Sequence, residues 1–195
     1  MAATLNIVAK WRKVGIPRVE EGVDRVLLRA EAYTSRISTE RHSVVEVLTQ
    51  HDGFSFCFQQ VDEAPTDRTA LAAMALSMVS RDACEEVCLD FPMVDLRVRD
   101  DARYMIGLRS GPNIVTQAAE QLRLELNEVG GRASAAAEVA VSRGSGPRTI
   151  RIDGPFIVAI NRNGAPVDED KVVFAAYCNR SCWRRPADGR MPGSP

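Results

Sequence analysis

Five cysteines are the residues that most readily suggest chemistry in this chain: Cys57, Cys84, Cys88, Cys178 and Cys182. Four of them form two pairs with C-x-x-x-C spacing. Two such pairs could supply the four thiolates of a zinc site, because zinc is often held by two ligands from each of two segments. The alternative is that the thiols are small buried apolar side chains. We favour this alternative, and we expect no metal and no cofactor.

Groups for nucleophilic catalysis are sparse. The two histidines, His42 and His51, have no catalytic or metal-binding partner nearby in the sequence. Gly144-Ser145-Gly146 lacks the strand-turn-helix context in which a hydrolase presents its nucleophilic serine, and no histidine lies near it. We therefore expect that the protein is not an enzyme.

Charge and composition exclude further classes of protein. The 25 basic and 26 acidic side chains give a net charge of -1, whereas nucleic-acid-binding proteins usually carry a strong basic excess. No apolar run approaches the roughly 18 residues that a membrane-spanning helix needs. The N-terminal residues lack the basic start and the apolar segment of a signal peptide. We expect an intracellular protein, or one whose leader was removed before this chain was defined.

Strand patterns dominate the chain. The phenylalanines at 54, 56 and 58 alternate, which predicts a half-buried strand, and His51-Asp52-Gly53 before them predicts a turn. Together they predict a β-hairpin over Ser43–Gln60. Further strands are expected at Leu5–Trp11, Val26–Tyr33, Val87–Val98, Thr149–Ile152, Pro155–Asn161 and Val172–Cys178.

Two helices are expected. The longer covers Pro65–Asp82, with Thr66 as its N-cap and a core-facing stripe of Leu71, Met74, Ala75 and Met78. A short one is expected at Asp100–Leu108. The segment Gln117–Asn127 is ambiguous, although its last residues alternate as in a strand.

Small residues fill the segment from Gly130 to Pro147, which has no large apolar side chain. It could be a flexible linker, or a segment small enough to slip between two strands. The Arg-, Pro- and Gly-rich residues 184–195 are expected to form a disordered tail after a single domain over residues 1–183.

The segments Leu124–Ala137 and Ile152–Ala176 carry a resemblance to the serpin family. Leu124–Gly130, followed by Ala133–Ala137, is similar to the strand that leads into the serpin reactive loop. Ile152–Ile160 with Val172–Ala176 is similar to the buried C-terminal hairpin of serpins. Weaker similarities lie at Phe91–Leu96 and at Lys10-Trp11. They run from about Thr4 to Cys178 and correspond to the C-terminal half of the family's fold.

The resemblance implies a fold for this chain and an origin as a shortened member of the family. It implies an α+β, β-rich serpin-like fold with a reduced main sheet, a small C-terminal β-barrel, few helices and an exposed reactive-centre-like loop. The chain would then be a miniature or truncated serpin, and shortened serpin-like genes of this kind occur in viruses.

The resemblance also implies a site. In inhibitory serpins a protease cuts the exposed loop, which then inserts as a new strand in the main sheet. Gly144-Ser145 would be the reactive bond by family loop length, and Arg143-Gly144 would suit a trypsin-like protease. The loop hinge would consist of Glu128, Gly130, Gly131, Ala133, Ser134, Ala135, Ala136 and Ala137. Gly131 and Arg132 depart from the threonine and the acidic residue that the family usually has there.

Insertion needs two flanking strands, for which Lys10-Trp11 and Gln117–Asn127 are the candidates. The strands that are missing relative to a whole serpin would leave an exposed sheet edge, which would allow homo-oligomers or a complex with another serpin.

Three hypotheses about the protein remain open at this point. The first is a non-inhibitory or weakly inhibitory binding protein of the immune-modulating type. The second is an inhibitor of a serine protease that is cut at the reactive bond. The third is an inactive product, or a different β-rich fold. The expected partners are accordingly a serine protease or another serpin, with neither nucleic acid nor a membrane.

Overall fold

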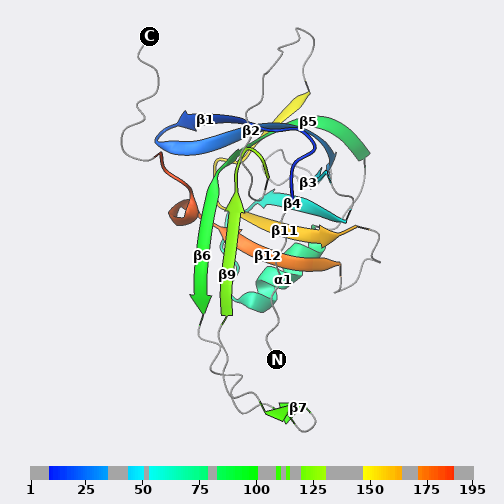
Figure 1. Ribbon diagram of the computed structural model, residues 1–195, viewed down its shortest axis with the longest axis vertical. Coiled ribbons are helices and arrows are strands. Elements are labelled where there is room, and N and C mark those ends of the chain that lie inside the picture. Colours follow the sequence, from blue (N-terminus) through cyan, green and yellow to red (C-terminus); the bar gives the residue numbers. More distant parts are fainter. Residues whose placement is uncertain are drawn as a thin grey trace.

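The architecture is that of a β-rich chain with a single α-helix among the residues that the structure describes. It is a computed structural model, and it describes residues 9–34, 44–50, 53–78, 83–100, 109–110, 113–114, 120–130, 147–163 and 171–186. Figure 1 shows a large curved sheet with a separate upright pair of strands beside it.

The large sheet has eight strands in the order β10-β5-β2-β3-β4-β11-β12, with β1 paired to β2. Only β10 is parallel to its neighbour, β5, so the sheet is mixed. The two ends of this order, β10 and β12, do not pair, so the described strands form no closed barrel. The strands are β1 (Ile16–Glu20), β2 (Val23–Thr34), β3 (Val45–Leu48), β4 (Phe54–Gln60), β5 (Ala83–Pro92), β10 (Arg148–Arg151), β11 (Phe156–Arg162) and β12 (Val172–Cys178).

The predicted hairpin is confirmed as β3 and β4, which pair antiparallel with Val45 opposite Phe58. Phe56 and Phe58 are buried, as the alternation predicts, but so are Ser55 and Cys57, which precede each of them. The prediction of a half-buried strand was therefore wrong. Ser55 and Cys57 are small, and the second face of β4 is covered as well.

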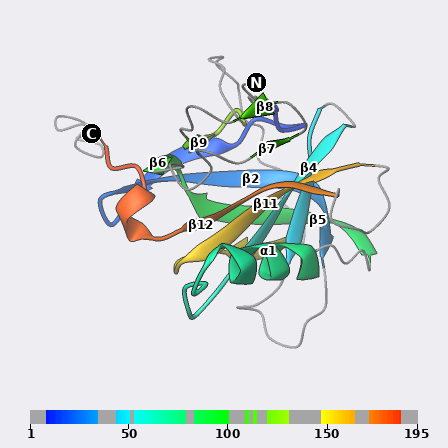
Figure 2. The ribbon, with the colours of Figure 1, turned by 90° about the horizontal axis from the view of Figure 1, so that it is seen from below.

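Helix α1 (Arg68–Ser77) supplies part of that cover. It lies against β11 and β12 (Figure 2). Its Ala75 and its C-cap residue Met78 share a buried cluster with Cys57 and Ile157. Leu71 and Met74 are partly buried against the same cluster, which confirms the predicted stripe.

The helix is shorter than predicted and begins at a different residue. Its N-cap is Asp67, not Thr66, because the Asp67 carboxylate accepts the N–H of Ala70 at 2.8 Å. It ends at Ser77 with Met78 as the C-cap, and residues 79–82 lie outside the described part.

The single strand predicted over Val87–Val98 is two strands. The chain leaves β5 at Pro92 and enters β6 (Val94–Asp100) after one intervening residue, Met93. β6 pairs antiparallel with β9 (Glu120–Leu126), so the ambiguous segment is a strand. Asp100, predicted to begin a helix, is the last residue of β6, and residues 101–108 lie outside the described part.

The remaining elements are short. β7 (Arg109–Ser110) pairs with β8 (Asn113–Ile114), and the 3-10 helix η3 (Arg180–Cys182) follows β12. After η3, the N–H of Arg184 donates to the carbonyl of Met93 at 2.8 Å, and its side chain donates to Asp24 at 2.8 Å. The ten-residue α1 is too short to cross a membrane, and none of the described helices is long and apolar enough to do so.

Candidate functional site

The first part of the predicted loop hinge is a tight turn at the end of β9. The side-chain oxygen of Asn127 accepts the backbone N–H groups of Val129 at 2.9 Å and of Gly130 at 3.1 Å. Asparagine favours turns because its side chain can bond the backbone two or three residues on. Glu128 is half-buried and Gly130 is buried. The turn therefore holds the exit of β9 in a fixed conformation.

Trp11 joins this turn to the hydrophobic core. Its indole N–H donates to the carbonyl of Asn127 at 2.9 Å, and its backbone N–H donates to that of Val129 at 3.1 Å. The ring is 1% exposed and packs edge-on against Phe56, with the ring centroids 5.2 Å apart. Trp11 thus fastens this turn to the large sheet.

The segment around Trp11 lies between the hinge and β3. Lys10 bridges Gly130 on one side, while Trp11 bridges Thr49 on the other. Gly15 adds a further bond, because its N–H donates to the carbonyl of Glu128 at 2.7 Å. The expected strand Leu5–Trp11 is seen here only as isolated bridges at Lys10 and Trp11, and residues 1–8 lie outside the described part.

Gly130 makes this close approach possible. Its φ of 121° lies in a region that L side chains rarely adopt. A Cβ atom there would lie 2.4 Å from the carbonyl oxygen of Ala9 and 2.7 Å from the Cα of Lys10. The two backbones can meet only because residue 130 has no side chain.

The two predicted flanks of an inserting loop are therefore in direct contact at the hinge end. Residues 10–11 are bonded to residues 127–130, so a strand entering between them at this end must first break those bonds. The remaining predicted hinge residues and the predicted reactive bond lie outside the described part: Gly131, Ala133, Ser134, Ala135, Ala136, Ala137, Arg143, Gly144 and Ser145. These assignments remain predictions.

A charged cluster anchors the strand that follows the predicted loop. Asp90 on β5 has a side chain only 3% exposed, and three guanidinium groups surround it. Arg25 lies 3.0 Å from its carboxylate, Arg18 3.5 Å and Arg151 3.6 Å. Arg25 also donates to the backbone carbonyl of Ile152 at 2.8 Å. The cluster thus joins β1, β2 and β5 to the chain at β10.

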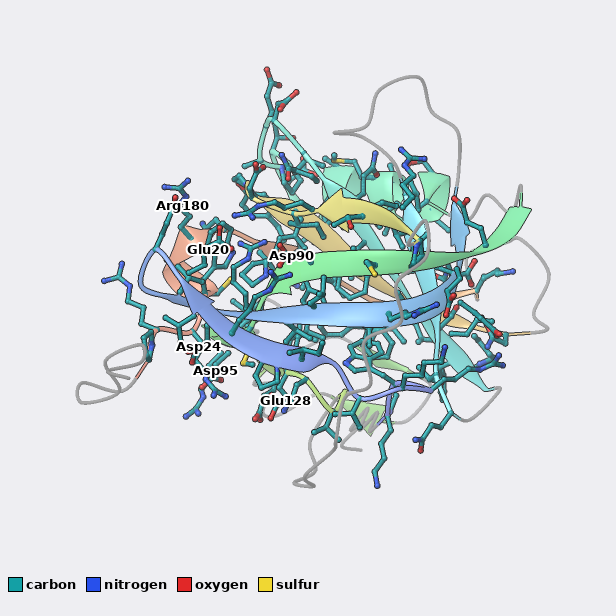
Figure 3. All side chains as sticks on the ribbon, turned by 90° about the horizontal axis from the view of Figure 1, so that it is seen from above. Glu20, Asp24, Asp90, Asp95, Glu128 and Arg180 are labelled. Carbon is teal, nitrogen blue, oxygen red and sulfur yellow. The ribbon has the colours of Figure 1, made fainter. Side chains whose placement is uncertain are left out.

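Glu20 at the end of β1 completes this cluster. Its carboxylate accepts a hydrogen bond from Arg151 at 2.8 Å, and that bond is the largest of the causes that lower the pKa of Glu20. Figure 3 shows Glu20 and Asp90 at the same end of the sheet. Sequence reasoning missed this cluster, although an aspartate inside the apolar run Leu89-Asp90-Phe91 was a usable signal, because a buried charge needs a partner.

The cysteine pairs are not brought side by side. Cys88 lies on β5 and Cys178 on β12, and β2, β3, β4 and β11 separate these strands in the sheet. Cys178 and Cys182 share a hydrogen bond, which lowers the pKa of Cys182 and, with burial, raises that of Cys178. Among the described residues, no three His, Cys, Asp or Glu side chains are grouped to hold a metal ion.

Comparison with solved structures gives the fold. A highly specific serpin of the insect Tenebrio molitor aligns with a TM-score of 0.60 and 15% identity, over 87% of this chain and 52% of that one. Human thyroxine-binding globulin in complex with thyroxine aligns with a TM-score of 0.61 and 13% identity, over 87% and 53%. A serpin of the trematode Schistosoma haematobium aligns with a TM-score of 0.57 and 14% identity, over 88% and 54%.

Comparison of the sequence alone finds less. No protein-family model matches the chain, and no curated protein matches it. The likeness therefore rests on the arrangement of the strands, and at 13–15% identity it concerns the fold alone. The chain spans about half the length of the serpins it matches, and over that span it has a serpin-like fold.

Proposed function

We propose that this serpin-like chain is a non-inhibitory or weakly inhibitory protein that acts by binding another protein, of the immune-modulating type, and not as an enzyme. The observation that carries the proposal is the closed hinge. Trp11 and Gly15 hold the backbone of residues 127–129 through hydrogen bonds of 2.7–3.1 Å, and Gly130 is packed against Ala9 and Lys10.

The closed hinge bears on inhibition because trapping a protease requires fast insertion of the cut loop. Insertion at this end would remove the acceptors of a buried indole N–H and of two backbone N–H groups before new ones form. A buried donor without a partner costs about 1–3 kcal/mol. The proposed partner recognition therefore uses the surface of the folded chain and does not depend on loop insertion.

Inhibition of a serine protease is the second candidate, and the strands on either side of the predicted loop favour it. β9 ends at Leu126 and β10 begins at Arg148, so residues 131–146 join a hinge to an edge strand as a reactive loop would. In this candidate the protease attacks Gly144-Ser145 or Arg143-Gly144.

Incubation with trypsin, a thrombin-like protease and an elastase-like protease separates the two candidates. We expect cleavage within residues 131–146 and no complex that survives a denaturing gel, with the cut bond identified by intact mass. A covalent complex broken at Arg143-Gly144 or Gly144-Ser145 would overturn the proposal in favour of the inhibitor.

The melting temperature of the cleaved chain gives a second measurement. Insertion of the cut loop would add a strand and its hydrogen bonds, and so raise the melting temperature sharply. We expect cleavage to leave it within about 5 °C of the intact value. An Arg143→Ala variant serves as the control, because it removes trypsin cleavage at Arg143-Gly144, keeps the other arginine of the segment, Arg132, and leaves the described residues unchanged.

A further inference from the structure

A cavity of about 420 Å³ lies at the end of the sheet beside the Asp90 cluster, away from the hinge. Three segments far apart in the sequence form its walls. These are the turn between β1 and β2, the end of β10, and residues 180–185. Figure 3 shows Glu20 and Arg180, from two of these walls, at the same end of the molecule.

Four arginines and three carboxylates line the cavity, but their charges are not evenly matched along its walls. Arg25 and Arg151 are already paired, with Asp90 at 3.0 Å and Glu20 at 2.8 Å. The wall made by residues 180–185 contributes two further arginines and no carboxylate: Arg180 and Arg185 have no acidic partner among the described residues. The other carboxylates, Glu21 and Asp153, belong to the opposing walls and are exposed to solvent.

Trp183 on the same wall carries an unused hydrogen-bond donor. The residue is only 8% exposed, and its indole N–H has no acceptor among the described residues. Buried donors in folded proteins almost always have an acceptor, so an orphaned indole N–H beside a cavity indicates a missing one. The guanidinium carbon of Arg180 lies 5.6 Å from the centroid of the Trp183 ring, so it stacks on the ring and not on a carboxylate.

We propose that this cavity binds a small oxyanion, a phosphate or carboxylate group of a soluble molecule, on the wall formed by residues 180–185. Arg180 and Arg185 supply the positive charge and the planar donor geometry that pairs of anionic oxygens fit. When the Arg180 guanidinium turns from the indole ring towards the anion, the Trp183 N–H becomes a further donor to the same anion. The volume is that of a small-molecule site. Because the site is remote from the hinge, this proposal stands or falls independently of the proposed function.

Titration with inorganic phosphate and, separately, with citrate tests the proposal, at constant ionic strength set with sodium chloride. Heat of binding gives the affinity, and tryptophan fluorescence reports whether Trp183 is affected. We expect saturable binding of one anion per chain for at least one of the two probes. Tighter binding of phosphate would assign a phosphate ligand, and tighter binding of citrate a carboxylate.

Substitutions locate the binding. The double variant Arg180→Gln/Arg185→Gln is expected to bind at least roughly 10-fold more weakly, because two charge-assisted bonds are lost. Trp183→Phe keeps an aromatic side chain but removes the indole N–H together with its five-membered ring, and should weaken binding severalfold. Arg148→Gln is the matched control, since Arg148 is exposed on β10 but does not line the cavity. Its affinity should be unchanged.

The proposal is overturned if neither anion binds saturably up to about 10 mM. It is overturned equally if the double variant binds as tightly as the unmodified chain. Both arginines are exposed and lack an acidic partner among the described residues, so the double variant should keep its melting temperature, and a matching melt excludes misfolding as the cause of weaker binding.

Discussion

Gly130 shows how much can depend on the absence of one side chain. Replacing Gly130 with alanine would place a Cβ atom 2.4 Å from the Ala9 carbonyl oxygen, on a backbone with φ of 121°. We expect Gly130→Ala to lower the free energy of unfolding by roughly 2 kcal/mol or more, measured by urea denaturation. Gly53→Ala is the control, because a Cβ there meets nothing within 4 Å. Equal stability of the two variants would show that the hinge can relax.

Glu86 gives a prediction for pH. Hydrogen bonds from Arg29 and then Lys13 lower its pKa from 4.5 to about 2. A carboxyl group whose pKa is depressed in the folded state contributes stability above its unfolded pKa, and this is lost as the pH falls from about 4.5 towards 2. In urea denaturation from pH 6 to pH 2, Glu86→Gln should therefore lose less stability than the unmodified chain. An identical pH profile would contradict this role.

The attachment of β10 to the sheet depends on the buried pair of Arg25 and Asp90. Both side chains are at most 4% exposed, and Arg25 is the nearest of the three guanidinium groups around Asp90. Arg25→Met should lower the free energy of unfolding by up to roughly 3 kcal/mol in urea denaturation, because Asp90 then keeps only the longer contacts to Arg18 and Arg151. Adding Asp90→Leu should restore part of the loss, because the buried carboxylate is then gone as well.

The matched control is a pair on the surface between the same two strands. The Arg29 side chain is 52% exposed in its pair with Glu86, so Arg29→Met should destabilise the protein far less than Arg25→Met. If Arg25→Met were as mild as Arg29→Met, the buried pair would not be what holds β10.

Elements set by local pattern were the predictable part of the structure. The phenylalanine alternation predicted the hairpin β3–β4, and the helical stripe predicted the buried face of α1. The choice of Asp67 over Thr66 as N-cap could not be read from residue type, since both are good caps and only the backbone path decides between them. The pairing of Arg25 with Asp90 spans 65 residues, so no local pattern reveals it.

At the scale of the whole molecule, one buried cluster joins the large sheet to the β6–β9 pair. A single cluster contains Trp11, Leu126 of β9, Phe156 of β11 and Trp183 after η3. The β6–β9 pair therefore cannot unfold without exposing apolar side chains of the large sheet. We expect thermal unfolding followed by circular dichroism and by tryptophan fluorescence to give one coincident transition. Two separate midpoints would show that the β6–β9 pair is an independent unit.

The candidate site also depends on the arrangement of the whole molecule, and for this reason little of it was predicted from the sequence. The resemblance placed the hinge at Glu128 and Gly130, and the structure describes both as part of one tight turn. Trp11 and Asn127, which fasten this turn to the core, are 116 positions apart in the sequence. The cavity is likewise lined by three segments that lie far apart in the sequence. Such arrangements follow from topology and not from spacing along the chain.

The bond between Arg184 and Asp24 has a consequence for how the protein is made. These residues are 160 positions apart, and Asp24 is the second residue of β2, an interior strand of the large sheet. A ribosome that adds roughly 5–20 residues each second needs about 8–32 s to extend the chain from one to the other. For that time the apolar side chains of the emerging strands have no complete partner surface. The bond can therefore form only long after β2 has been made, and in the meantime the unpaired strands are exposed to aggregation.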